Sequence, residues 1–187
     1  MMARTLSRTT LSSLTLLLTL SSFDSVVCSQ QKPGTRFERD YLISVAREIM
    51  TAARYCALIT RDSAGHAHAR TMDAFTPDAD MHIWLATNPR SEKVVEIRKD
   101  HRVTLYYFDR ESQAYVAIRG LARLVNDPTE KAKRWKDEWK EFYPDRAKDY
   151  LLIAVTPERL EVLNVKKGIL GDPHTWKPPS VSFGKRG

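Results

Sequence analysis

The connections between strand-like segments constrain the fold of this chain more than any other feature. Seven segments rich in β-branched, aromatic and alternating apolar residues recur, and turn-forming residues separate most of them. Parallel strands need crossovers of a dozen or more residues, so these strands must pair mainly antiparallel. We expect the first three to form a meander and the last two a hairpin around Thr156, Pro157 and Glu158. The predicted strands are residues 55–60, 66–76, 81–87, 103–108, 114–125, 150–155 and 159–165.

Helical patterns lie only around this strand series. Apolar residues recur at helical spacing over residues 36–54, a short helix is expected over 91–99, and Asp127 and Pro128 are typical of the start of a helix that runs to about Glu141. Gly120 within a long strand indicates a bulge of the kind that curves a sheet. The sequence therefore predicts a mainly β (α+β) fold, a six- to seven-stranded antiparallel split barrel with peripheral helices.

The predicted domain spans residues 36–176. Residues 1–29 resemble a targeting segment, because Arg4 and Arg8 precede a leucine-rich stretch and the first acidic residue is Asp24. We expect a secretory signal peptide and a periplasmic or secreted protein; an organellar transit peptide and a lipid anchor at Cys28 are the alternatives. No stable membrane span is expected in the mature chain. The chain from Gly168 is expected to lack regular structure, with residues 177–187 as a flexible tail.

The cysteines and the distribution of charge argue against a disulfide-stabilised protein and against a nucleic-acid-binding protein. Cleavage would leave Cys56 as the single thiol, so no intramolecular disulfide is expected. The whole chain carries a formal net charge of +7, which raises the question of nucleic-acid binding. However, the basic residues of 131–140 alternate with acidic residues, and Trp135 and Trp139 lie four apart as a packing stripe. We therefore interpret this stretch as a solvated amphipathic helix and expect no nucleic-acid partner.

One segment has the features of an anion-binding site. The predicted strand 81–87 ends at Thr87, Asn88 follows it, and Ser91 and Lys93 lie in the first turn of the next helix. Free backbone N–H groups, the positive end of the helix dipole, a hydroxyl and an ammonium would meet there. Arg70, on a neighbouring predicted strand, adds a guanidinium whose planar fork suits phosphate. The alternative is a purely structural role, in which Asn88 and Ser91 only cap a helix.

The residues of this predicted anion site also occur in a known protein family. From about Arg39 to Trp176 the chain resembles the flavin-binding split-barrel family that includes the pyridoxamine 5'-phosphate oxidases, and more closely its general-stress-protein branch. The resemblance rests on Arg70, on Thr87 and Asn88, and on Ser91-Glu92-Lys93, with Arg119-Gly120 and Trp176 continuing it. It implies a homodimer that holds FMN, with its phosphate on these groups, Thr71 and Met72 beside the flavin ring, and Trp176 reaching the flavin.

The sequence departs from the true pyridoxamine 5'-phosphate oxidases at several positions. Phe75 stands where those enzymes have a second basic residue, Glu92 stands where they have arginine, and Lys177 and two prolines follow Trp176. We therefore do not expect vitamin B6 oxidation. The resemblance instead implies an FMN-dependent oxidoreductase that acts on an unidentified small molecule, and no residue stands out as a catalytic acid or base.

Three alternatives remain open at this point. The first is a non-catalytic module that holds flavin, deazaflavin or haem, although haem would need an axial ligand such as His66, His68, His82 or His101. The second is a protein that acts through its basic surface, which salt-dependent binding would reveal. The third is a metal site at His66 and His68, which share a strand face; the sequence offers no further ligand at a useful spacing, and we expect none.

Overall fold

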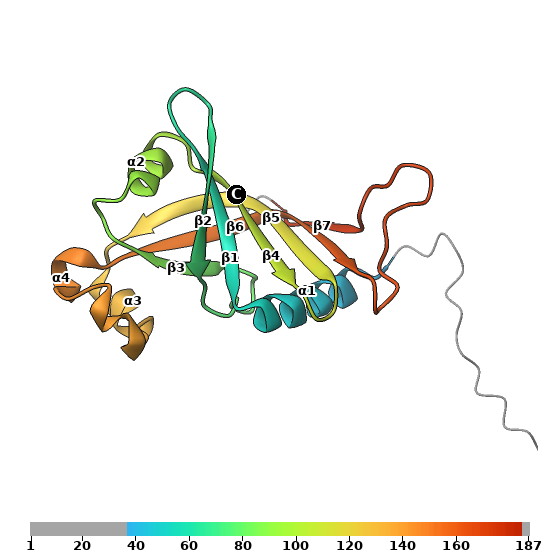
Figure 1. The fold of residues 1–187 in the computed structure, drawn as a ribbon, viewed down its shortest axis with the longest axis horizontal. Coiled ribbons are helices and arrows are strands. Elements are labelled where there is room, and N and C mark those ends of the chain that lie inside the picture. The colour runs from blue at the N-terminus through green and yellow to red at the C-terminus, as the bar shows by residue number, and fades with distance from the viewer. Residues whose placement is uncertain (1–36, 185–187) are drawn as a thin grey trace, which may run out of the picture. The chain divides into compact units, whose positions relative to one another are not determined.

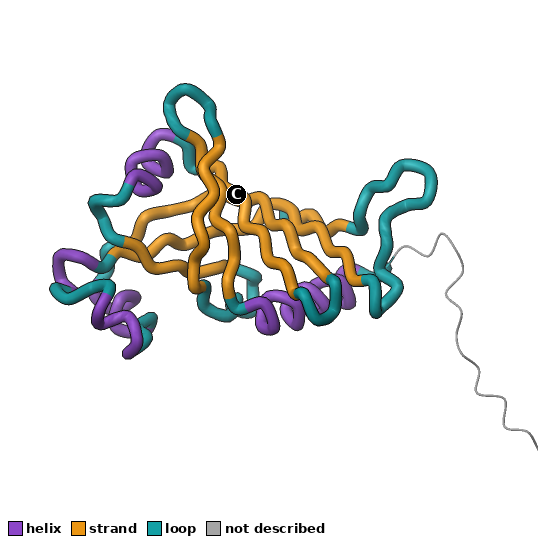
Figure 2. The backbone as a smooth tube through the Cα atoms, in the orientation of Figure 1, coloured by secondary structure: helices purple, strands orange, loops and turns teal. Residues whose placement is uncertain are grey.

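A computed structural model describes residues 37–184, and the predicted targeting segment lies outside these residues. Seven strands form one antiparallel sheet that curves into a half-open barrel, and the helices lie at its periphery (Figures 1 and 2). The predicted fold class is confirmed. The elements are α1 (Arg39–Ala53), β1 (Tyr55–Arg61), β2 (Ala67–Asp73), β3 (Ile83–Thr87), α2 (Glu92–Lys99), β4 (Arg102–Asp109), β5 (Ala114–Val125), α3 (Pro128–Lys133), the 3₁₀ helix η1 (Asp137–Glu141), α4 (Arg146–Asp149), β6 (Leu151–Asn164) and β7 (Ser180–Ser182).

The strand order is β2-β1-β4-β5-β6-β3, and β7 pairs with β6. The predicted meander is therefore wrong in its last step, because β3 pairs with β6 and not with β2. A single backbone hydrogen bond from Phe75 N–H to the Trp84 carbonyl follows the end of β2. Beyond it, a turn closed between Asp78 and His82 carries the chain away. This excursion gives β3 a different neighbour and leaves the sheet split.

The predicted hairpin around Pro157 is also wrong. Residues 151–164 form one continuous strand, β6, and its register against β5 shifts between Arg119 and Gly120. Gly120 is required at this bulge, because an added Cβ would lie 2.3 Å from the carbonyl oxygen of Thr156. Proline lacks an N–H for the ladder and is tolerated at such a bulge. The predicted bulge at Gly120 is thus confirmed, and Pro157 marks its other side.

The predicted helix over residues 128–141 is interrupted. Asp127 caps α3 by accepting a hydrogen bond from the Glu130 N–H at 2.8 Å, as expected, but α3 ends at Lys133 and the chain resumes as η1. The break lets Trp135 and Trp139 pack edge-to-face in one aromatic cluster with Tyr143 and Tyr150. Aromatic packing overrides helix continuity here.

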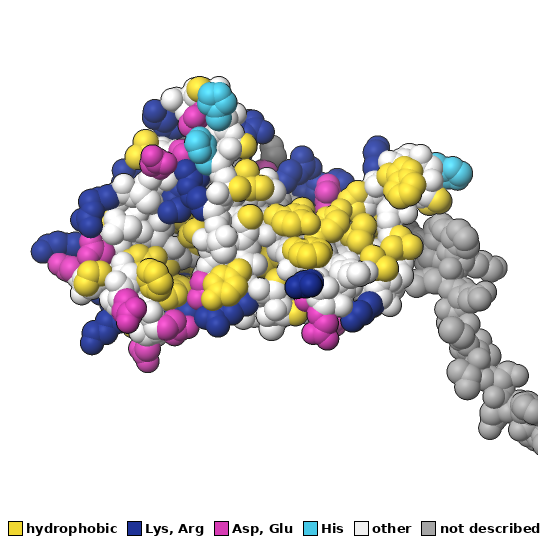
Figure 3. Space-filling model, in the orientation of Figure 1, with side chains coloured by type: hydrophobic (Ala, Val, Ile, Leu, Met, Phe, Trp, Pro, Cys, Tyr) yellow, Lys and Arg dark blue, Asp and Glu magenta, His cyan; other side chains and the backbone are white. Residues whose placement is uncertain are grey.

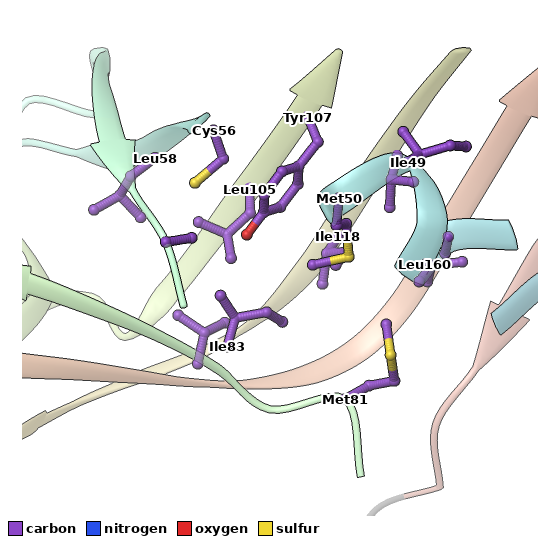
Figure 4. Close-up of a cluster of buried hydrophobic side chains, with 14 of the residues drawn as sticks. Ile49, Met50, Cys56, Leu58, Met81, Ile83, Leu105, Tyr107, Ile118 and Leu160 are labelled. Carbon is purple, nitrogen blue, oxygen red and sulfur yellow. The ribbon is translucent and has the colours of Figure 1, made fainter. Parts of the chain in front are cut away.

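The main core lies between α1 and the concave side of the sheet. Ile49 and Met50 of α1 pack with Leu105, Ile118 and side chains of the other strands (Figure 4). Such burial is the main source of stability. Cys56 is buried in this core, and burial raises the pKa of its thiol to about 12, so it is an inert packing residue. No helix within residues 37–184 is long and apolar enough to cross a membrane.

The expectation that the chain lacks regular structure from Gly168 is wrong in part. Ile169 forms an isolated bridge with Asn164, and Ser180–Ser182 add β7 to the second half of β6. β3 pairs with the first half of the same strand. The length of β6 therefore lets it hold two different neighbours along one edge.

Candidate functional site at the start of helix α2

The turn between β3 and α2 positions two of the predicted site residues. The Asn88 side chain accepts a hydrogen bond from the Arg90 N–H at 2.9 Å, and its carbonyl accepts one from the Ser91 N–H at 3.1 Å. Ser91 occupies the N-cap of α2, but its side chain makes no capping hydrogen bond. Its Oγ lies 3.0 Å from Oγ1 of Thr87 instead. Ser91 is thus more than a helix cap, because its hydroxyl joins a polar cluster.

Lys93 completes this cluster. Its Nζ donates a hydrogen bond to Oγ1 of Thr87 at 3.3 Å, and the side chain is half-buried. Within residues 37–184 Lys93 makes no ion pair with a carboxylate. Burial lowers its pKa, and the nearby charge of Arg70 lowers it further, whereas the carboxylates of Glu96 and Glu92 oppose this shift in part. A half-buried cation without a carboxylate partner is the feature that a bound anion would stabilise.

Arg70 lies next to this cluster but is already engaged. Its guanidinium donates to Oγ1 of Thr60 at 2.7 Å and to Oε1 of Glu96 at 2.9 Å, and Thr60 donates to the other oxygen of Glu96 at 2.5 Å. The Glu96 side chain is only 8% exposed. Arg70 therefore lies near Lys93 as half of an ion pair with Glu96, and its observed hydrogen bonds are directed to protein groups.

Sequence reasoning missed Glu96 and Thr60. Burial raises the pKa of Glu96, but hydrogen bonds from Arg70 and Thr60 outweigh it and hold the pKa below its usual value. A signal was present, because Glu96 lies between Val94 and Ile97, which are buried on α2. A carboxylate on the buried face of a helix needs a partner, and Arg70 is that partner.

A cavity of about 490 Å³ lies against this cluster. The structure brings five predicted residues to its wall: Thr71, Met72, Thr87, Asn88 and Lys93. Two further predicted residues lie outside this wall. Ser91 contacts Thr87, and Arg70 lies near Lys93. The opposite wall is aromatic and comes from the segment after α3, with Trp139, Phe142 and Tyr143. The Trp139 stripe was recognised in the sequence as a packing feature, but its place in the cavity wall depends on the break between α3 and η1.

Trp176 is not part of this arrangement within one chain. Its side chain is 84% exposed, and the segment 165–179 lies at the opposite end of the sheet from α2 (Figure 1). Its expected role therefore requires a second copy of the chain.

His66 and His68 both lie beside the carboxylate of Asp62. The rings of His66 and His68 lie 3.1 and 3.3 Å from the same carboxylate oxygen of Asp62, and this contact closes the β1–β2 turn. In the part of the chain that the structure describes, no group of three His, Cys, Asp or Glu side chains is arranged to hold a metal ion.

A family model described as pyridoxamine 5'-phosphate oxidase like matches residues 43–171. The chain belongs to this family. The match includes the β3–α2 turn, Arg70 and the aromatic wall, and it ends before Trp176.

Solved structures share the fold of this pyridoxamine 5'-phosphate oxidase-like domain. A protein from Clostridium acetobutylicum related to general stress protein 26 is 20% identical, with 79% of this chain and 97% of that chain covered and a TM-score of 0.63. General stress protein 26 from Bacillus anthracis is 21% identical, with 76% and 99% covered and a TM-score of 0.61.

A third structure comes from Nostoc punctiforme and is named a pyridoxamine 5'-phosphate oxidase-related, FMN binding protein. It is 15% identical, with 78% of this chain and 96% of that chain covered and a TM-score of 0.58. At these identities the likeness concerns the fold. Among curated proteins, none matches the chain.

Proposed function

We propose that this protein binds FMN in the cavity beside α2 and uses it for redox chemistry on a small molecule. One observation carries the proposal: Lys93 is half-buried, has no carboxylate partner among the described residues and lies with the hydroxyls of Thr87 and Ser91 at the start of a helix. Such a site favours a phosphate. Two findings support FMN as the molecule that carries this phosphate: the chain belongs to the pyridoxamine 5'-phosphate oxidase-like family, and the Nostoc relative is named an FMN binding protein.

The residues present fit this cofactor. The cavity volume of about 490 Å³ lies within the ordinary range for small-molecule sites, about 300–1,000 Å³. Its polar end has the positive charge that a phosphate needs, and its aromatic wall suits a flat apolar ring. The carboxylates at the far end, Asp73 and Glu138, both form ion pairs with Arg54, so they leave little free negative charge to repel the phosphate.

The chain's own residues would bind and orient the cofactor. FMN, when bound, supplies the hydride or electron transfer. Lys93 and the neighbouring hydroxyls would hold the phosphate, while Arg70 would neutralise Glu96 and so keep that carboxylate from repelling the phosphate. Thr71 and Met72 would offer backbone groups and an apolar surface to the ring. Trp139 would exclude water from one side.

We also propose a homodimer, because the outer face of the sheet is apolar. Tyr106 stacks on Tyr115 with ring centroids 5.5 Å apart, and Phe108 beside them is 53% exposed. Hydrophobic side chains gather over β4 and β5 in Figure 3. Exposed apolar patches of this kind mark protein interfaces. Light scattering should give twice the chain mass, and Phe108→Glu should give the mass of one chain. A monomeric wild type would contradict the dimer.

The test of the proposed function compares FMN with riboflavin, which lacks the phosphate. The full chain should bind FMN with visible flavin absorption bands and bind riboflavin more weakly. Lys93→Ala should weaken FMN binding by about tenfold to a hundredfold and leave riboflavin binding nearly unchanged. Lys99→Ala, at the exposed end of α2, is the matched control. A wild type that fails to bind FMN, or that binds both flavins equally, would overturn the proposal.

A non-catalytic flavin carrier is the second candidate. The observation that favours it is the state of the cavity's carboxylates, Asp73 and Glu138, which are both paired and so are poor candidates for a catalytic acid or base. Turnover with NADH or NADPH and an electron acceptor separates the two functions. Steady oxidation of NADH or NADPH, with the bound flavin reduced by the donor and reoxidised by the acceptor, would establish the enzyme; bound flavin that stays oxidised would favour the carrier.

A further inference from the structure

A second cavity, of about 410 Å³, is lined by four arginines from four different strands. They are Arg61 at the end of β1, Arg102 at the start of β4, Arg119 on β5 and Arg159 on β6. This cavity shares no residue with the one that Lys93 lines. The proposed FMN site does not account for it.

The strand register gathers these charges on the outer face of the sheet. Ile59 of β1 pairs with Thr104 of β4, Thr104 pairs with Arg119 of β5, and Arg119 pairs with Arg159 of β6. Like charges directly opposite each other destabilise a sheet. The cross-strand pair of Arg119 and Arg159 is therefore unfavourable unless a negative charge lies between or above them.

Carboxylates of the protein neutralise only part of this charge. Asp100 binds Arg102 through two hydrogen bonds of 2.8 Å, and Glu161 accepts one of 3.1 Å from Arg159. Arg61 and Arg119 form no ion pair within residues 37–184. Glu158 is the one carboxylate on the cavity wall as the structure describes it. Together with Asp100 and Glu161, Glu158 sets three carboxylates against four guanidinium groups, so the cavity keeps one positive charge in excess.

The bulge between β5 and β6 shapes this cavity. Gly120 and Pro157 face each other at the register shift, so that Glu158 is the additional residue on β6 and Arg159 returns opposite Arg119. The close approach of Gly120 to the Thr156 carbonyl makes the bend a fixed feature of the backbone. The arginine stems therefore start from a rigid, curved surface, which reduces the cost of ordering them around a ligand.

We propose that this cavity binds a small molecule that carries at least two anionic oxygen groups, phosphate or carboxylate, close together. Several guanidinium forks on one wall suit such a compact polyanion, because each fork can donate two parallel hydrogen bonds. A nucleic-acid duplex fits less well, because the arginines converge on one cavity beside an apolar face and do not follow an extended backbone. The site is separate from the flavin site, and its ligand can exchange while FMN stays bound.

The test titrates pyrophosphate, citrate and inorganic phosphate into the full chain by calorimetry, after FMN has been added. If FMN does not bind, the same titrations are made in the Lys93→Ala background, so that failure of the proposed function leaves this test intact. We expect one pyrophosphate per chain and weaker binding of single phosphate. Citrate that binds as well as pyrophosphate would show that the site accepts carboxylate and phosphate groups alike, and citrate that does not bind would assign phosphate ligands.

The variants locate the site. Arg61→Ala with Arg119→Ala should weaken pyrophosphate binding by at least about tenfold. Arg110→Ala with Arg123→Ala removes the same charge from exposed positions outside the cavity and should change binding by less than about twofold. Arg61→Lys with Arg119→Lys keeps the charge without the fork and should lie between them. Circular dichroism checks that each variant is folded, and the lysine pair carries the test if the alanine pair is not.

Four results would overturn the proposal. The first is a wild type that binds none of the three anions. The second is an equal loss in the cavity pair and in the control pair, which would indicate general charge attraction. The third is a change of oligomeric state in the cavity pair, which would assign these arginines to a contact between copies of the chain. The fourth is a duplex oligonucleotide that displaces pyrophosphate at lower concentration, which would assign the surface to nucleic acid.

Discussion

The two basic regions of this protein differ in how their arginines are held. At the α2 site, Arg70 is 21% exposed and bonded to a nearly buried carboxylate, so its position is fixed before any ligand arrives. At the sheet cavity, Arg61 and Arg119 are exposed in the single chain, and neither forms an ion pair with a carboxylate among the described residues. Buried charges must be paired, whereas exposed charges tolerate solvent as their partner. The first arrangement suits a resident cofactor and the second suits a ligand that comes and goes.

This contrast predicts a large difference in the contribution to folding. Glu96→Ala should lower the free energy of unfolding by about 2 kcal/mol, because it leaves Arg70 and Thr60 without their acceptor in a mostly buried position. The partial exposure of Arg70 keeps this loss below that expected for a fully buried pair. Arg61→Ala should cost less than about 0.5 kcal/mol. Urea denaturation measures both. Glu92→Ala is the control, because Glu92 approaches Arg70 from the same helix but is 87% exposed. Equal losses in Glu96→Ala and Glu92→Ala would contradict the contrast.

The same ion pair should make stability depend on acidity. The pKa of Glu96 lies below its usual value in the folded protein, so the unfolded chain binds its proton first as the pH falls. The stabilisation is therefore full above the unfolded pKa of about 4.3 and is lost as the pH drops through the folded pKa. Glu96→Gln should be less stable at neutral pH and should lose less stability on acidification than the wild type. Parallel urea curves for the two proteins at neutral and acid pH measure this difference.

Salt concentration should affect ligand binding differently at the two basic regions. Exposed charges are screened by ions, whereas half-buried charges are screened much less. Between about 50 and about 500 mM NaCl, we expect pyrophosphate binding to weaken by about tenfold and FMN binding by less than about threefold. Calorimetry and flavin fluorescence at matched salt concentrations give both values. Identical salt dependence would remove the distinction between a held site and an open one.

Local features of the α2 site could be predicted, and its long-range features could not. Thr87, Ser91 and Lys93 lie within seven residues, so one strand end and one helix start bring them together. The pairing of Arg70 with Glu96 joins a strand to a helix across the barrel. It depends on α2 packing back against β1 and β5, which no local pattern encodes.

In the fold, too, local features could be predicted and long-range features could not. The strands and their antiparallel pairing follow from alternation and short connections, and all seven predicted strand segments lie within strands of the structure for most of their length. Pro157 was misleading because proline is typical both of a turn and of a bulge. The choice between them depends on Gly120, which lies opposite on another strand. A pattern read along one chain segment does not contain its partner.

The smallest expected effect concerns the protonation of Lys93. Burial, together with the charge of Arg70, lowers the pKa of this ammonium, so it loses its proton at a lower pH than an ordinary lysine, whose pKa is about 10.4. FMN affinity should therefore fall severalfold as the pH rises into the alkaline range, in step with the loss of that charge. Lys93→Arg keeps its charge throughout, because arginine has a pKa above about 12, and its affinity should stay flat. Any titration of the flavin itself would appear equally in both proteins. A fall in affinity that is the same in Lys93→Arg would show that the phosphate does not rest on this side chain, and the α2 site would then lack the fixed cation that distinguishes it from the sheet cavity.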